Sequence, residues 1–168
     1  MSGPPPLRIF VDADGCPVKE EVYRVGARLE LEVVVATNRW MRVPLGDRVR
    51  LAVIEGGFDA VDDWIAGAVV PGDVVVTADV PLAARCLEAG ARVLGPRGRE
   101  FAEESIGDAL ATRALLADLR QGGLAGTGPA PFDQRDRRHF LQELDRLVQA
   151  SLRARHEAEG VNARGMRP

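Results

Sequence analysis

The stretch LRIFVDADGCP, residues 7–17, is a short apolar run that ends in two aspartates, Asp12 and Asp14. A second run of the same kind, DVVVTAD at residues 73–79, ends in Asp79. Nearly continuous apolar runs of this length are typical of strands that are buried on both faces of a parallel sheet. In such a sheet the carboxyl ends of the strands share one edge, where ligands bind. If the two strands adjoin, their carboxylates meet in one crevice.

The rest of the chain alternates predicted strands with predicted helices, which favours an α/β fold with a mostly parallel sheet of about five strands flanked by helices. The remaining strands are expected at residues 32–36, 49–54 and 92–94, and the helices at 19–29, 58–68, 81–89, 105–120 and 133–158. We expect a single domain over residues 7–158, with a flexible proline-rich arm at 1–6 and a disordered tail at 159–168.

Bulk properties limit the classes of function. The chain has 168 residues and a net charge of −3, which argues against broad electrostatic binding to nucleic acid but allows a local basic patch. No apolar run approaches the ~18 residues of a membrane span, and the N-terminus does not resemble a signal peptide, so a cytoplasmic protein without membrane association is expected. Cys16 and Cys86 are then expected to be free thiols outside any zinc pattern.

Four acidic residues form the candidate metal site. Asp12 and Asp14 are two residues apart at a strand end and face the same side, and Asp79 occupies the same edge if the strands adjoin. Asp62 is the plausible fourth ligand, because it flanks an apolar helical stripe near a helix start. Clustered carboxylates repel one another unless a cation or shared protons offset their charge, and a hard divalent cation is the usual solution.

Each acid also has a purely structural interpretation. The pair Asp14-Gly15 suits a turn, Asp12 could cap a helix that starts at Pro17, and Asp79 could cap a helix that starts at Pro81. Two further acids in the second predicted helix, at residues 58–68, are given structural roles. Asp63 points away from the apolar stripe towards solvent, and Asp59 is placed to cap that helix.

Cys16 lies near a predicted helix N-terminus, where the helix dipole lowers a thiol pKa. A nucleophilic role is conceivable, but the neighbouring carboxylates oppose formation of a thiolate. A buried structural thiol is the better interpretation.

Arginines gather in three segments, NRWMR at 38–42, GPRGR at 95–99 and RDRR at 135–138. Arginine binds phosphate through two parallel hydrogen bonds, although solvated surface arginines are the alternative in each case. The segment at 95–99, which contains Arg97, directly follows a predicted strand and therefore falls at the same sheet edge as the acids. Trp40 stands between two of these arginines and either stacks on a base or packs against the protein.

Five motifs together resemble the YaiI/YqxD family of small bacterial proteins over roughly residues 7–150. These motifs are DxDxCP at 12–17, FDxxD at 58–62, TADxPLAA at 77–84, PRG at 96–98 and RDR at 135–137. The resemblance implies a PIN-like three-layer sandwich, the fold of many metal-dependent nucleases.

Residue by residue, the resemblance implies acidic site positions and phosphate-binding positions. Asp63 matches no position of the family, whereas the acids that match are Asp12, Asp14, Asp59, Asp62 and Asp79, and the phosphate-binding candidates are Asn38, Arg97 and Arg137. The chain also departs from the pattern. Gly15 replaces an alanine, no acid follows the arginine of Thr112-Arg113-Ala114, and no acid follows the fifth strand, where PIN nucleases generally have one.

The leading functional expectation is a Mg²⁺- or Mn²⁺-dependent phosphodiesterase that acts on RNA or DNA. Asp12 and Asp79 are the expected catalytic residues, the four acids hold one or two ions, and Arg97 stabilises charge on the phosphate. One alternative is a PIN-like module that binds nucleic acid or protein without turnover. A second is a haloacid-dehalogenase-like phosphatase, suggested by the DADG sequence at 12–15, although Lys19 is the only lysine and is misplaced for that chemistry.

Overall fold

The computed structural model describes residues 5–123 and 130–165. Most of the predicted N-terminal arm, the centre of the glycine-rich loop and the last three residues lie outside this part of the chain. The strands are β1 Arg8–Asp12, β2 Glu32–Thr37, β3 Val49–Val53, β4 Val74–Val76, β5 Arg92–Leu94 and β6 Glu100–Phe101. The helices are α1 Lys19–Arg28, α2 Ala60–Ala68, α3 Val80–Glu88, α4 Glu103–Gln121 and α5 Gln134–Gly165.

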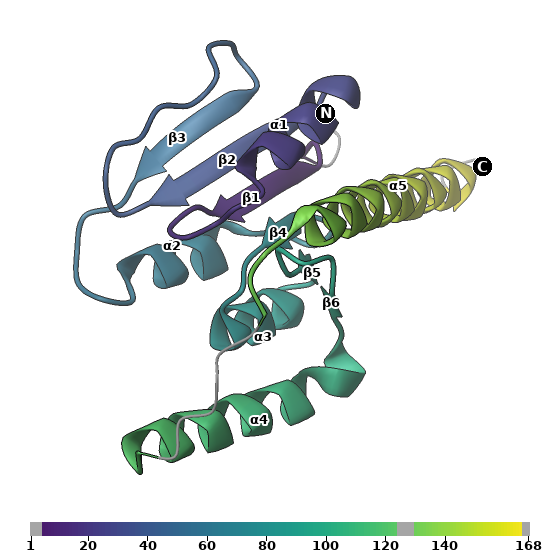
Figure 1. The fold of residues 1–168 in the computed structure, drawn as a ribbon. Coiled ribbons are helices and arrows are strands. Elements are labelled where there is room, and N and C mark those ends of the chain that lie inside the picture. Colours follow the sequence, from purple (N-terminus) through teal and green to yellow (C-terminus); the bar gives the residue numbers. More distant parts are fainter. Residues whose placement is uncertain (1–4, 124–129, 166–168) are drawn as a thin grey trace.

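The strands form one sheet in the order β3-β2-β1-β4-β5-β6 (Figure 1). The first five strands run parallel, and β6 pairs antiparallel with β5. The predicted, mostly parallel α/β sheet is therefore confirmed, with six strands in place of about five. The extra strand was not predicted because two residues are too few to show a hydrophobic period.

The strand order reverses at β1. The chain builds β1, β2 and β3 outward in one direction and then returns to place β4 on the other side of β1. In open α/β sheets, ligands bind outside the carboxyl ends of the strands at such a reversal point. Asp12 ends β1, and Thr77 directly follows β4, so both residues lie at this point.

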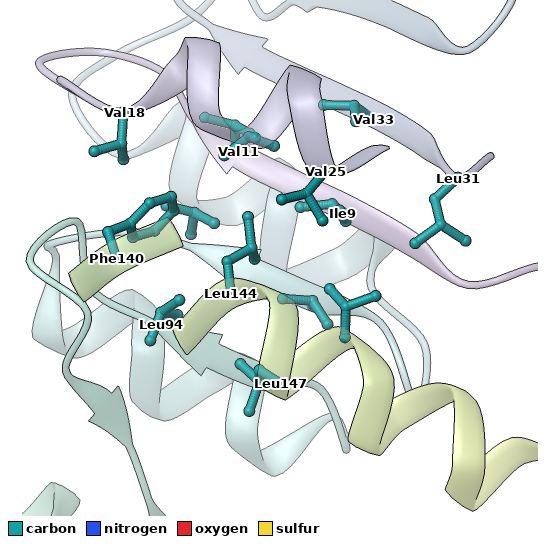
Figure 2. Packing of buried hydrophobic residues seen from close by; sticks show 14 of the residues in the cluster. Ile9, Val11, Val18, Val25, Leu31, Val33, Leu94, Phe140, Leu144 and Leu147 are labelled. Carbon is teal, nitrogen blue, oxygen red and sulfur yellow. The ribbon is translucent and has the colours of Figure 1, made fainter. Parts of the chain in front are cut away.

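Alternating residues of each strand face opposite layers. On one face, α1 and α5 pack on Ile9, Val11 and Val33, as Figure 2 shows with Phe140 and Leu144 of α5 directed at the same apolar layer. On the other face, α2 and α3 pack on alternate residues of the strands, Phe10, Val34, Val75 and Val93. Because strand side chains alternate with a period of two, the sheet is covered on both faces and the fold has three layers.

Helix α4 is an exception to this layering. It packs mainly on α3, on the outside of that layer (Figure 1), and it has no buried residue among those described. Leu115 and Leu116 are among its exposed apolar side chains.

Helix α5 continues to Gly165, beyond the Ala158 at which the sequence suggests that it ends. Residues 159–165 are thus helical where a disordered tail was expected. The segment from Leu152 onward is rich in Ala, Arg and Glu, which favour helix without a buried face. Within the described residues, no helix combines the length and apolar character that a membrane span requires.

Candidate functional site

The predicted crevice exists at the carboxyl edge of β1 and β4. Two hollows of about 350 and 700 Å³ open there, and three aspartates, Asp12, Asp14 and Asp79, line both of them. Asp62, the proposed fourth ligand, and Asp59 line the larger hollow. The fold therefore brings together all four predicted metal ligands, although they come from segments separated by up to 67 residues between Asp12 and Asp79.

Asp12 is the last residue of β1, and its carboxylate is joined to the end of β4. Its Oδ2 accepts a hydrogen bond of 2.8 Å from Thr77 Oγ1, and the same hydroxyl oxygen accepts one of 3.0 Å from the backbone N–H of Asp79. Burial raises the pKa of Asp12, and the negative charges of Asp79 and Asp14 raise it further, while the Thr77 hydrogen bond lowers it. The side chain of Asp12 is thus held in place, although its surroundings disfavour the charged form of the carboxyl.

Asp14 lies in a turn, as one structural interpretation predicted. The backbone N–H of Cys16 donates to Ala13 O over 3.1 Å, and Gly15 takes a positive φ of 76° that favours glycine. The carboxylate of Asp14 accepts hydrogen bonds from Thr37 Oγ1 at 2.8 Å and from the backbone N–H of Asn38 at 3.3 Å. The turn and a place in the site are therefore compatible.

The two capping interpretations have different outcomes. Asp79 is the N-cap of α3, and its Oδ1 accepts a hydrogen bond of 2.9 Å from the backbone N–H of Leu82. Asp12 does not cap α1, because that helix begins at Lys19 with Val18 as its N-cap. Asp79 therefore both begins a helix and lines the crevice, whereas Asp12 lines it without a capping role.

Asp62 lies in the first turn of α2. Burial raises the pKa of its carboxyl to about 6, with further contributions from the charges of Asp79, Asp12 and Asp59, and only Arg85 opposes them. Burial is the largest cause of this rise in pKa, and the neighbouring carboxylates add to it. The clustering predicted from separate sequence segments thus has an electrostatic consequence at Asp62.

The two remaining acids of this region differ from each other. Asp63 is exposed and pairs with Arg85 over 2.7 Å, so its predicted position outside the crevice is confirmed. Asp59 occupies the N-cap position of α2, but its side chain makes no capping hydrogen bond. The predicted capping bond of Asp59 is therefore wrong, because the carboxylate lines the larger hollow instead.

The donor atoms suit a hard divalent cation, because every crevice acid offers carboxylate oxygens. Within residues 5–123 and 130–165, however, no group of three or more His, Cys, Asp or Glu side chains is already arranged to hold a metal ion. Instead, Asp14 accepts a hydrogen bond from the Thr37 hydroxyl, and Asp79 accepts one from the backbone N–H of Leu82. The residues fit a cation by chemistry, and the carboxylates would have to turn towards it.

The predicted phosphate-binding residues are only partly at the crevice. Asn38 lines the larger hollow. Arg97 instead pairs with Asp136 over 2.9 Å, and its guanidinium lies 5.8 Å from the ring centre of Phe132. Arg137 donates to Glu21 over 3.1 Å and lies 5.0 Å from the same ring. Arg97 therefore joins the loop after β5 to the start of α5, and Arg137 joins the start of α5 to α1.

Sequence reasoning missed Arg113. This residue of α4 lines both acidic hollows and is the cationic residue among their described lining. Its helix has a weak amphipathic pattern and no buried residue, so periodicity did not direct it to the site. The available signal was the departure from the family pattern at Thr112-Arg113-Ala114.

Cys16 lines the smaller hollow, but burial raises the pKa of its thiol. The charges of Asp12 and Glu21 act in the same direction, against a hydrogen bond from the Val18 backbone and the positive charge of Lys19, which lower it. This direction supports the interpretation of Cys16 as a structural thiol.

Comparison with known proteins gives a consistent match over nearly the whole domain. Residues 10–150 match the family model described as "Uncharacterized BCR, YaiI/YqxD family". A UPF0178 protein of Rhodospirillum centenum is 52% identical over 153 residues, which cover 89% of this chain and 99% of that protein. A UPF0178 protein of Azorhizobium caulinodans is 50% identical over 151 residues, covering 90% of this chain and 95% of that protein. No solved structure was found to match.

Proposed function

The chain belongs to the YaiI/YqxD family, and we propose that it is a Mg²⁺- or Mn²⁺-dependent phosphodiesterase that acts on RNA or DNA. The observation that carries this proposal is the gathering of Asp12, Asp14, Asp62 and Asp79 around one crevice at the reversal point of the sheet. The PIN-like character implied by the motifs remains a prediction that points the same way.

In this proposal the four acids bind one or two cations, with Asp12 and Asp79 closest to the reaction. A bound divalent cation lowers the pKa of a water molecule and polarises a phosphate oxygen. Thr77 orients the Asp12 carboxylate through its 2.8 Å hydrogen bond. Asn38 and Arg113 line the same crevice, and in this proposal they contact the phosphate.

Arg97 and Arg137 remain proposed phosphate contacts of lower rank. Each would have to leave a carboxylate partner, Asp136 or Glu21, before it could bind a substrate phosphate. Arg113 forms no ion pair in the part of the chain that the structure describes, so it needs no such rearrangement.

The test combines metal binding with cleavage. Mn²⁺ binding is measured by calorimetry, and cleavage of labelled single-stranded RNA and DNA is followed with and without Mn²⁺. Asp12→Asn and Asp79→Asn are expected to abolish both, and asparagine preserves the cap that residue 79 supplies to α3. Asp63→Asn is the matched control, since that exposed acid lies outside both hollows. Metal binding without any cleavage would contradict the proposed activity.

A second candidate is a PIN-like module that binds nucleic acid or protein without turnover. It is favoured by the carboxylates not being arranged as a ready metal site among the described residues, and by Gly95-Pro96-Arg97 following β5 without an acid. Salt-dependent RNA binding with no cleavage in Mn²⁺ would identify this function.

The phosphatase alternative has less support. Lys19, the only lysine, donates to the backbone oxygen of Cys16 over 3.0 Å and does not line the hollows that contain Asp12. That reaction therefore lacks the lysine it would use beside Asp12.

A further inference from the structure

Two exposed aromatic side chains flank the acidic crevice, and the proposed function does not use them. Trp40 is 75% exposed and Phe58 is fully exposed. By contrast, Phe10 and Phe140 are completely buried, and Trp64 packs against Phe10 with ring centres 6.2 Å apart. Large aromatic side chains are usually buried, so two of them exposed at one edge of the molecule require an explanation.

Their position relative to the acids is defined by shared lining residues. Trp40 lines a hollow that also contains Asp14 and Asn38. Phe58 lines the larger acidic hollow, which contains the same Asp14 and Asn38. The two aromatic side chains therefore border neighbouring depressions that meet at the Asp14 side of the crevice.

The loop that carries Trp40 is tied to the acidic site. Thr37 ends β2, and its hydroxyl donates to Asp14 and is within 3.1 Å of Arg39 O. The backbone N–H of Arg39 in turn donates to that hydroxyl over 3.3 Å. A single threonine thus positions both a crevice carboxylate and the residue that precedes Trp40.

The charge around Trp40 differs from the charge in the crevice. Lys19 and Arg39 line its hollow, and neither forms an ion pair within the described residues. An exposed indole beside unpaired cations suits a ligand that combines flat apolar faces with negative charges. Nucleobases linked by phosphates have this combination, and base stacking on aromatic side chains is the usual way to bind single strands.

We propose that Trp40 and Phe58 form a base-stacking subsite that selects single-stranded nucleic acid and directs it across the acidic crevice. The inference rests on the proposed phosphodiesterase function for its biological purpose, but it concerns binding alone. In a duplex the base faces are already stacked on one another, so the two aromatic side chains discriminate against it.

Binding is measured on the Asp12→Asn protein in EDTA, so that no cleavage intervenes. Labelled oligouridylate, oligothymidylate and a duplex of the same length are titrated by fluorescence anisotropy. Both single strands are expected to bind roughly tenfold or more tightly than the duplex. The ratio of the two single-strand affinities distinguishes RNA from DNA as the preferred ligand.

Variants then identify the subsite. Trp40→Ala is expected to weaken single-strand binding roughly tenfold, Phe58→Ala to weaken it by a similar factor, and Trp40→Phe to retain most of the affinity. Leu45→Ala is the matched control, because Leu45 is equally exposed but lines a hollow away from the acids. All three positions are exposed, so the four substitutions are expected to leave the fold unaffected.

A second readout does not depend on affinity. The chain has two tryptophans, so in a Trp64→Phe background only Trp40 emits. Stacking on a base is expected to quench this emission on addition of either single strand. The proposal is overturned if Trp40→Ala binds like the parent, or if the duplex binds as tightly as the single strands.

The outcome is separable from that of the proposed function. Stacking without cleavage by the unsubstituted protein in Mn²⁺ would support the subsite and contradict the phosphodiesterase. Cleavage by the unsubstituted protein, together with an unchanged single-strand affinity in Trp40→Ala, would support the phosphodiesterase and contradict the subsite. No binding of any nucleic acid would overturn the subsite and direct the search towards protein partners.

Discussion

The aspartates at the two ends of the sheet differ in whether an arginine pairs with their carboxylates. At the amino end, Asp73 is completely buried but accepts hydrogen bonds from the backbone and guanidinium of Arg8, at 3.2 and 2.9 Å, and from the backbone N–H of Val70. At the carboxyl end, Asp12 and Asp62 have raised pKa values, and the hydrogen bond that Asp12 accepts comes from the neutral hydroxyl of Thr77.

This difference separates a structural carboxylate from a binding one. A buried carboxylate whose hydrogen bonds are satisfied by a cation holds strands and helices together. Carboxylates that cluster without a paired cation cost stability, and the structure tolerates them where a ligand can relieve the repulsion.

The largest effect is expected at the amino end. Asp73→Ala leaves the Arg8 guanidinium partly buried without its partner and should lower the free energy of unfolding by about 3 kcal/mol. Urea unfolding followed by circular dichroism measures the change. Asp63→Ala removes an exposed ion pair and should cost less than about 1 kcal/mol. Equal losses of unfolding free energy in Asp73→Ala and Asp63→Ala would show that the buried pair contributes no more than the exposed one.

Binding of a divalent cation should stabilise the folded protein through the acids at the carboxyl end of the sheet. At a Mn²⁺ concentration of about 100 times Kd, binding to the folded state contributes about 2.7 kcal/mol, which raises Tm by several degrees in a chain of this size. The increase should disappear in Asp12→Asn and Asp79→Asn and persist in Asp63→Asn. Differential scanning fluorimetry with and without EDTA provides the measurement. An identical increase in all variants would mean that the cation binds elsewhere.

The pKa of Asp62 predicts a smaller and pH-dependent effect. A carboxyl pKa raised from 3.8 to about 6 by folding means that the folded state holds the proton more tightly. Its unfavourable contribution is absent below the unfolded pKa, grows as pH rises from the unfolded to the folded pKa, and is complete above the folded pKa. Asp62→Asn should therefore stabilise the protein by about 1 kcal/mol near pH 8, after a discount for solvent screening, and hardly at all near pH 4.

The control for this effect is the outward-facing neighbour. Asp63→Asn should produce no such gain at high pH, because its carboxyl pairs with Arg85 in solvent. A gain at Asp62 that is equal at both pH values would show that the acidic cluster is not its cause.

The smallest effect is expected at Arg113. Arg113→Ala should leave the free energy of unfolding within about 0.5 kcal/mol, since the residue is exposed. Removing a cation from the lining of the acidic hollows should tighten Mn²⁺ binding by about two- to threefold. Calorimetry measures this change, and Arg120→Ala, on the same helix but outside the hollows, serves as control. Weaker Mn²⁺ binding in Arg113→Ala would contradict the predicted electrostatic role.

Sequence reasoning was most successful where a local pattern decides a local structure. The apolar run before Asp12 and the valine run before Asp79 each define a strand, and a side chain that follows a parallel strand must lie at its carboxyl edge. Asp62 and Asp63 were likewise separated correctly, because the apolar stripe of α2 orients the helix.

It was less successful where several packing solutions were compatible with the pattern. Asp59 stands at an N-cap position, yet its carboxylate lines the crevice. Arg97 follows β5 as expected, yet its guanidinium pairs with Asp136 and lies over the Phe132 ring. In each case a partner from elsewhere in the fold decides what the side chain contacts.

The chain's own pattern was enough to determine the alternation of strands and helices and the identity of the residues at the strand ends, since both depend on neighbours a few positions away. Only the tertiary structure decided that α4 brings Arg113 to the acids, and that Trp40 and Phe58 border neighbouring depressions that share Asp14 and Asn38. These juxtapositions depend on how loops and helices far apart in the chain pack across the sheet, and no short-range period records that packing.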